Sequence, residues 1–269
     1  MNKIKLSLSC IMIFVLSNSF SQLNIETKFP PPVGYERMFN DGLSTFIRTH
    51  PLKNDNVVND SYGDSVMNEN TWMAVFDYDL GTHKFHQCAD AAIYLHAKYN
   101  WKAKYYDKLE FNTVSGTLLK FNDYLNGVKY KGNEDWTDLI LDWTNPSPRL
   151  DNIKNFNNWL IKVWGWAGTK SFHHDTISVN MEDIRPGDIF NDGSHVVSIV
   201  DVVINKKTGN KKYMLAQSYM RNGDTNYGEE QYVLLNPSTK DVWYDVNEDN
   251  IIDTPMYQYY KTDLSRFKY

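Results

Sequence analysis

The cysteine content limits how this chain can be stabilised. It has two cysteines, and the first, Cys10, lies in an N-terminal segment with the pattern of a cleaved secretory signal. The mature chain would then keep only Cys88, and one thiol cannot form an intramolecular disulfide. The remaining length is enough for one large domain or two small ones, so we expect a fold held together by a hydrophobic core.

The first 21 residues have three features of a signal peptide. Two lysines lie near their start, the run 6–16 is almost wholly apolar, and small residues precede Gln22. The apolar run is too short to span a bilayer as a helix, and no later segment has the length and apolarity of a membrane span. We therefore expect cleavage near Ser21 and a soluble mature chain in the periplasm, at the cell surface or outside the cell. A lipid anchor on Cys10 is the weaker interpretation, because the apolar core follows that cysteine.

Charge and composition argue against several classes of protein. The net charge of −5 and a pI near 5.8 provide no basic surface for nucleic acid. Walker, G-x-S-x-G and dinucleotide-binding motifs are missing from the sequence, and we predict no cofactor. The 8 Trp, 18 Tyr and 13 Phe predict a core of large rings, with stacking on sugars as the alternative for an exported protein.

The order of the expected elements favours an α+β fold. Helical patterns dominate the first part of the chain, and strands with tight turns dominate the last third. This order is typical of helices packed on an antiparallel sheet. We expect one domain over residues 22–269, with an extended lead-in around Pro30-Pro31-Pro32. The expected helices cover 43–50, 87–99, 117–125 and 152–166, and the expected strands cover 71–79, 105–114, 189–190, 196–204 and 212–217.

Cys88 is the first candidate for chemistry. We expect it at the start of a helix, where unpaired backbone N–H groups and the helix dipole favour a thiolate, although Asp90 in the same turn would oppose it. A base is therefore needed, and His195 is the best candidate because it opens a strand after Gly193-Ser194. A cysteine with a histidine far downstream is the order of papain-type pairs. A buried core thiol and a structural histidine are the alternatives.

A third polar group should orient the imidazole of the histidine. The strand after His195 ends at Gln217-Ser218, which puts either side chain near the ring, and Gln217 is the preferred candidate. The backbone N–H of Cys88 at the helix start can help to stabilise an oxyanion, with Gln87 as an assisting donor.

A metal site is the main rival interpretation of this region. His83, His86 and Cys88 place three potential ligands within six residues, and His173-His174 could add to them. Their spacing matches no standard zinc pattern, and a turn followed by a helix would splay the three side chains. We therefore predict no zinc.

A second metal pattern lies near the C-terminal end of the sequence. Asp245, Asn247 and Asp249 resemble the first half of a calcium-binding loop. The glycine at the sixth position is missing, and Met256 stands where the acidic twelfth residue should be. A polar turn is the preferred interpretation.

Two sequence blocks, Gln87-Cys88-Ala89-Asp90 and Ala216-Gln217-Ser218-Tyr219, are specific enough to indicate a family. Together with further blocks they resemble a bacterial exported family known only as domain of unknown function 4846, from about residue 30 onward. The resemblance implies a family without implying an activity. The further blocks are Pro51-Leu52-Lys53, Ala74-Val75-Phe76-Asp77-Tyr78-Asp79-Leu80-Gly81, Trp166-Ala167-Gly168-Thr169, Gly187-Asp188-Ile189-Phe190, Asn236-Pro237, Trp243-Tyr244 and Thr254-Pro255.

A weaker resemblance is to the CHAP and NlpC/P60 cell-wall hydrolases of the papain-like group. It rests on Gln87-Cys88 opening a helix and on Gly187-Asp188 and His195 at the following strands. The resemblance implies a papain-like fold in which Cys88 is the nucleophile, His195 is its base, and segment 216–218 supplies the orienting group.

The segment 216–218 departs from the pattern of these hydrolases. CHAP enzymes typically carry an acidic and an amide residue where this chain has Ala216 and Ser218. The change leaves Gln217 as the orienting group, with Ser218 as the weaker one. Pro-Gly-His is common before the strand, whereas this chain has Gly193-Ser194-His195. Both departures bear on the efficiency of catalysis more than on the fold.

The sequence thus predicts a papain-like α+β thiol hydrolase that acts on an amide or peptide bond outside the cytosol. Cell-wall peptide is the first substrate to consider, and either water or an amine could accept the acyl group. The alternative keeps the fold without the chemistry: an exported protein that binds glycan or peptide through its aromatic side chains.

Overall fold

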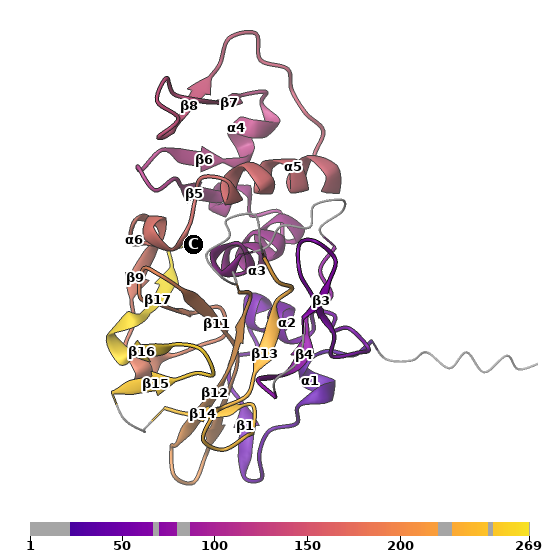
Figure 1. The fold of residues 1–269 in the computed structure, drawn as a ribbon, viewed down its shortest axis with the longest axis vertical. Coiled ribbons are helices and arrows are strands. Elements are labelled where there is room, and N and C mark those ends of the chain that lie inside the picture. The colour runs from indigo at the N-terminus through magenta and orange to yellow at the C-terminus, as the bar shows by residue number, and fades with distance from the viewer. Residues whose placement is uncertain (1–21, 67–69, 80–86, 220–227, 247–249, 269) are drawn as a thin grey trace, which may run out of the picture.

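The computed structural model describes residues 22–66, 70–79, 87–219, 228–246 and 250–268 (Figure 1). These residues form an α+β fold, as predicted, in which helices pack on an antiparallel sheet. The signal-like segment 1–21 lies outside the described residues. Within the described ranges, no helix has the length and apolarity needed to cross a membrane.

The described residues build a nine-stranded antiparallel sheet. Its longest strand, β11 (Val196–Asn205), is rich in Val and Ile and is buried on both faces for most of its length, as a central strand should be. The predicted turn at 206–210 joins β11 to β12 (Lys211–Gln217). Seven strands follow one another in the order β4 (Trp72–Val75), β13 (Tyr232–Leu234), β12, β11, β10 (Ile189–Asn191), β17 (Leu264–Phe267) and β9 (Thr176–Ser178). Two more strands lie off this path: β1 (Tyr35–Arg37) pairs with β11, and β14 (Trp243–Asp245) pairs with β12.

Helices and small hairpins surround this sheet. The long helix α3 (Cys88–Lys102) lies against β11, and α2 (Gly42–Arg48) lies beside both. The other helices are α1 (Ile25–Lys28), α4 (Phe121–Leu125), α5 (Ile153–Trp164) and α6 (Phe172–Asp175), with 3₁₀ turns at Tyr106–Lys108, Thr169–Ser171, Met181–Asp183 and Lys261–Asp263. The hairpins pair β2 (Val58–Asn59) with β3 (Ser65–Val66), β5 (Glu110–Asn112) with β6 (Leu118–Lys120), β7 (Lys129–Gly132) with β8 (Leu139–Asp142), and β15 (Ile251–Asp253) with β16 (Gln258–Tyr260).

Helix α3 lies between two parts of the hydrophobic core. Ile93 belongs to the same apolar cluster as Phe156 and Trp159 of α5, whereas Leu95 belongs to the cluster that contains Val200 of the sheet. A helix with apolar contacts on all sides is a buried helix. Figure 1 shows α4, α5 and the hairpins β5–β8 toward one end of the molecule, the sheet toward the other, and α3 between them.

The structure corrects two expected elements between residues 105 and 125. The expected strand 105–114 is a 3₁₀ turn followed by the short β5, and the first part of the expected helix 117–125 is β6. Gly116 explains the difference, because its φ of 99° makes the tight turn between these strands. Leu119 then lies buried opposite Phe111, and the helix begins only at Phe121.

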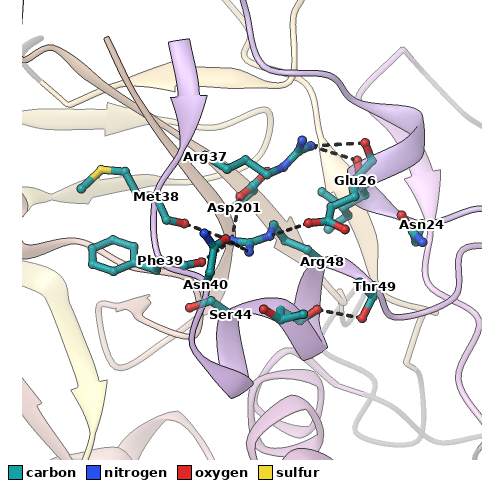
Figure 2. A network of polar contacts seen from close by, with 12 residues as sticks. Asn24, Glu26, Arg37, Met38, Phe39, Asn40, Ser44, Arg48, Thr49 and Asp201 are labelled. Atoms are coloured by element: carbon teal, nitrogen blue, oxygen red, sulfur yellow. Dashed lines mark hydrogen bonds and ion pairs between the residues drawn. The ribbon is translucent and has the colours of Figure 1, made fainter. Parts of the chain in front are cut away.

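A buried polar network attaches the N-terminal elements to β11 (Figure 2). The pairing of β11 with β12 shifts in register between Ile199 and Asp201, and Asp201 lies on the side of α2. Its carboxylate accepts a hydrogen bond from Nε of Arg37 at 2.9 Å and lies 3.6 Å from Nη1 of Arg48. Arg48 also donates to the backbone oxygens of Met38 and Phe39 and to the side chain of Asn40. The network thereby holds β1 and α2 on the sheet.

His96 and Gly187 fix α3 against the turn that leads into β10. Nε2 of His96 donates to the carbonyl oxygen of Gly187 at 2.8 Å, and the ring packs on Phe267. Gly187 has a φ of 95°, and a Cβ there would lie 2.9 Å from Cδ2 of Leu43, so only glycine suits this position. Burial lowers the pKa of His96 to about 4, which keeps its imidazole neutral at neutral pH.

Candidate functional site

Cys88 is the first residue of α3, in agreement with the sequence analysis. Gln87 is the N-cap, with an extended backbone, and its N–H donates to the carboxylate of Asp90 at 2.8 Å. This contact belongs to a capping box and defines where the helix begins. The thiol therefore lies at the helix end whose first N–H groups have no intrahelical partner.

Protein atoms surround the thiol of Cys88, although the residue as a whole keeps some exposure. The pKa of the thiol is raised to about 11, mainly by burial and in smaller part by the Asp90 carboxylate. Backbone N–H groups of Val196, Ala89 and Cys88 itself act in the opposite direction and do not outweigh burial. The resting site therefore holds a neutral thiol, whereas the sequence analysis expected the helix start to favour a thiolate.

His195 directly precedes β11, at the turn that the sequence predicted to open this strand. The Asp192 carboxylate accepts hydrogen bonds from the backbone N–H groups of Ser194 at 2.7 Å and His195 at 2.8 Å, which fixes the backbone there. The side chain of His195 is buried, and the next residue, Val196, hydrogen-bonds through its N–H to the Cys88 sulfur. The fold thus brings Cys88 and His195 to one junction, between α3 and β11.

Gln217, the last residue of β12, contacts the imidazole of His195. Its Oε1 lies 2.9 Å from Nε2 of the ring, and both residues are buried. β11 and β12 are adjacent antiparallel strands, so the start of the first lies beside the end of the second. The Gln217 Nε2 donates to the hydroxyl of Tyr232 at 3.1 Å and to the sulfur of Met256 at 3.4 Å.

Two tyrosines complete the surroundings of the imidazole. Tyr257 stacks on the His195 ring, with centroids 4.3 Å apart and planes inclined by 18°, and Tyr219 meets the same ring edge-on at 5.6 Å. Burial lowers the pKa of His195 below its ordinary value of 6.5, and the bond to Gln217 and the charge of Asp192 act against this shift. His195 is therefore a neutral base at neutral pH.

The remaining predicted residues have other contacts. The hydroxyl of Ser218 donates to the backbone oxygen of Glu229, so it is Gln217 that lies on the imidazole. Gln87 caps the helix through its backbone. Among the residues that the structure describes, no hydrogen bond joins the Cys88 sulfur to the imidazole of His195.

The sequence analysis missed Met256, Tyr257 and Tyr219 as neighbours of the site. Tyr219 belonged to a family-specific block, and Thr254-Pro255 belonged to another, but neither block carried a role at that stage. The signal that could have found them is the position of these residues beside turns, where side chains can be presented to a neighbouring strand end.

The possible metal ligands other than Cys88 form no metal site in the described residues or lie outside them. His83 and His86 belong to the segment 80–86, and Asn247 and Asp249 to 247–249, which the structure does not describe. Asp245 pairs with Lys212 at 2.7 Å. Within the described ranges, no three His, Cys, Asp or Glu side chains are grouped as metal ligands would be.

Comparison with known proteins places the chain in a family. No curated protein and no solved structure matches it. A family model described as "Domain of unknown function (4846)" matches residues 25–266, which include every residue of the Cys88–His195–Gln217 site. The chain therefore belongs to the family of domain of unknown function 4846.

Proposed function

We propose that the protein is an exported, cysteine-dependent amide or peptide hydrolase with a papain-like arrangement of its catalytic groups. The proposal rests on the 2.9 Å hydrogen bond between Nε2 of His195 and Oε1 of Gln217. The next residue after His195, Val196, hydrogen-bonds through its N–H to the Cys88 sulfur. A polar side chain that holds one imidazole nitrogen leaves the other, Nδ1, for the nucleophile. Cys88 would be the nucleophile, His195 the base and Gln217 the orienting group.

The reaction begins when the Cys88 thiol transfers its proton to Nδ1 of His195 and the sulfur attacks the carbonyl carbon of the amide. The carbonyl electron pair moves to oxygen, and the backbone N–H of Cys88 stabilises this oxyanion. When the tetrahedral adduct collapses, the C–N bond breaks and His195 gives the proton to the departing amine. Water, deprotonated by His195, then attacks the thioester and releases the acid and the thiol.

The pKa values of the resting site favour a neutral pair over a thiolate–imidazolium pair. Burial raises the pKa of Cys88 to about 11 and lowers that of His195 below 6.5, so no proton is transferred before substrate binds. Proton transfer and attack therefore occur together, with His195 already in its basic form at neutral pH. The acidic limb of the pH–rate profile is expected below pH 6.5.

Cell-wall peptide is the substrate class to test first. The signal-like segment 1–21 supports export, and amide bonds outside the cytosol include those of peptidoglycan peptides. Water is the acyl acceptor in this proposal. Release of a free carboxylate would distinguish hydrolysis from transfer to an amine.

The test compares the mature wild-type protein with Cys88→Ala and His195→Ala on peptidoglycan fragments, with products followed by mass spectrometry. We expect amide cleavage by the wild type and losses of roughly 10³-fold or more in both variants, as for other nucleophile–base pairs. Gln87→Ala should lose far less, because Gln87 only assists the oxyanion. Turnover that is unchanged in Cys88→Ala would rule out thiol catalysis.

A non-catalytic binding protein with the same fold is the second candidate. The raised pKa of Cys88 and the missing bond between its sulfur and the imidazole, within the described part of the chain, favour it. Peptide or glycan would then bind through aromatic side chains such as Tyr219 and Tyr257. Calorimetric binding of the same fragments by wild type and Cys88→Ala, without cleavage by either, is the result that this candidate predicts.

A further inference from the structure

We infer that Met256 and Tyr257, at the tip of the hairpin β15–β16, are positioning residues that fix the tautomer and the plane of the His195 imidazole. The inference rests on the proposed function, since it assigns these residues to the same site. Neither residue carries a role in the sequence motifs. Each contacts one member of the His195–Gln217 pair.

The sulfur of Met256 determines which way the Gln217 amide points. A thioether has no proton to donate and can only accept a hydrogen bond, so the amide atom 3.4 Å from it is the NH₂ nitrogen. Tyr232 accepts the second proton of the same nitrogen at 3.1 Å. The carbonyl oxygen Oε1 must then face His195.

The orientation of Gln217 determines the tautomer of His195 in turn. Oε1 can only accept, so Nε2 of the neutral imidazole must carry the proton at the 2.9 Å contact. The other nitrogen, Nδ1, is left with its lone pair. This is the tautomer that can take a proton from Cys88, and the reverse amide orientation would require the opposite one.

Tyr257 fixes the plane of the same ring. A stack at 4.3 Å and 18° restricts rotation of the imidazole, and the edge-on contact of Tyr219 restricts it from a second direction. The hydroxyl of Tyr257 hydrogen-bonds to Tyr219. The pKa of Tyr257 is raised to about 12, mainly by burial and in smaller part by Tyr219. The two tyrosines therefore hold each other as well as His195.

A tight turn presents both residues to the site. The backbone N–H of Thr254 donates to the carbonyl of Tyr257 at 2.9 Å, and the Thr254 hydroxyl both accepts from the Tyr257 N–H at 3.0 Å and donates to its carbonyl at 2.7 Å. Buried Ile252 and Tyr259 face each other below the turn and anchor the hairpin in the core. Met256 and Tyr257 are thus held in place before any substrate arrives.

The test reads the His195 tautomer by ¹⁵N NMR on protein labelled at histidine, with His195→Ala used to assign the signal. In the wild type we expect a protonated Nε2 and an unprotonated Nδ1. Met256→Leu keeps the side-chain volume but removes the acceptor, and we expect a mixture of tautomers and a roughly threefold to tenfold loss of amide cleavage, the range for one neutral hydrogen bond. Tyr257→Leu should broaden the His195 signal, whereas Tyr257→Phe, which keeps the stacked ring but loses the hydroxyl bond to Tyr219, should broaden it less.

Two exposed residues provide matched controls. Met73 on β4 is 40% exposed and Tyr260 on β16 is 61% exposed, so Met73→Leu and Tyr260→Leu should leave the His195 signal and the rate unchanged. A wild-type tautomer with the proton on Nδ1, or a Met256→Leu spectrum identical to the wild type, would overturn the inference. The NMR result needs no substrate, so it decides the inference even if no amide is cleaved and the proposed function is wrong.

Discussion

The backbone N–H of Val196 hydrogen-bonds to the sulfur of Cys88, across the junction between β11 and α3. Val196 follows His195 directly, so the same stretch of backbone that carries the base also contacts the nucleophile. This contact lowers the pKa of the thiol, but burial has the larger effect and raises it to about 11. The competition between these two effects sets the reactivity of Cys88.

Cys88 should react slowly with iodoacetamide in the folded protein. A pKa of about 11 in place of 9.0 reduces the thiolate fraction at neutral pH about a hundredfold, and the rate should rise with pH without a plateau near neutrality. Removal of the neighbouring base in His195→Ala should slow the reaction further at pH 7. Protein unfolded in denaturant is the control and should react as a free cysteine. A rate plateau below pH 8 would contradict the raised pKa, and reaction only after unfolding would show a core thiol and exclude the hydrolase.

Gln217→Ala should reduce amide cleavage while leaving the protein folded. The substitution leaves Nε2 of His195 buried without its acceptor, a loss of about 1–3 kcal/mol or roughly 5- to 150-fold in rate. Ser218→Ala is the matched comparison, because its hydroxyl donates to the Glu229 backbone and not to the imidazole. It should reduce the melting temperature more than the rate. A larger loss of kcat in Ser218→Ala than in Gln217→Ala would show that the wrong residue has been assigned as the orienting group.

His96 should make the protein less stable in acid. Its pKa is lowered by burial from 6.5 to about 4, so between these values the unfolded chain binds a proton that the folded protein does not. Stability is therefore complete above pH 6.5 and falls by about 3 kcal/mol as the pH drops to about 4. His96→Gln keeps a donor for the Gly187 carbonyl but cannot titrate, and urea unfolding at several pH values should show a correspondingly smaller loss. Parallel pH curves for the two proteins would contradict the prediction.

Arg48→Met should destabilise the whole fold. Arg48 is 1% exposed, and its loss leaves the buried Asp201 with Arg37 as its one remaining cationic partner among the described residues, at a cost of about 3–5 kcal/mol. Lys206→Met breaks the surface pair with Glu36, in which Lys206 is 73% exposed, and should change stability by less than about 0.5 kcal/mol. Thermal unfolding measures both. Similar melting temperatures for the two variants would show that the network contributes no more than a surface pair.

The sequence predicted the elements whose patterns are local. The apolar run of β11, the turn at 206–210 and the start of α3 at Cys88 were predicted correctly, because Val and Ile content, Gly-Asn turn chemistry and the spacing of apolar residues each act over a few positions. Of the two hairpin strands beside Gly116, β5 lies within the predicted strand 105–114, which was too long, whereas β6 was wrongly predicted as part of a helix. Leu119 could fit either a helix or a strand, and its tertiary contact with Phe111 decided between them.

The surroundings of the candidate site depend on contacts that are remote in sequence. Gln217 was identified because its strand follows that of His195, a relation that can be read from chain order. The partners Met256 and Tyr257 come from a hairpin that pairs with neither strand, so no periodicity points to them. The raised pKa of Cys88 was also missed, because burial depends on packing from several elements, whereas the helix start is visible in the sequence.

The residues of this site are synthesised one after another, because the ribosome makes the chain from its N-terminus. Synthesis on the ribosome produces Cys88 well before His195 and Gln217, and it produces Met256 and Tyr257 after all three. An unfinished chain therefore carries its nucleophile without the base, the orienting amide or the rings that hold the imidazole. In the proposed hydrolase, the site is therefore complete only after the hairpin β15–β16 has folded onto the rest of the chain.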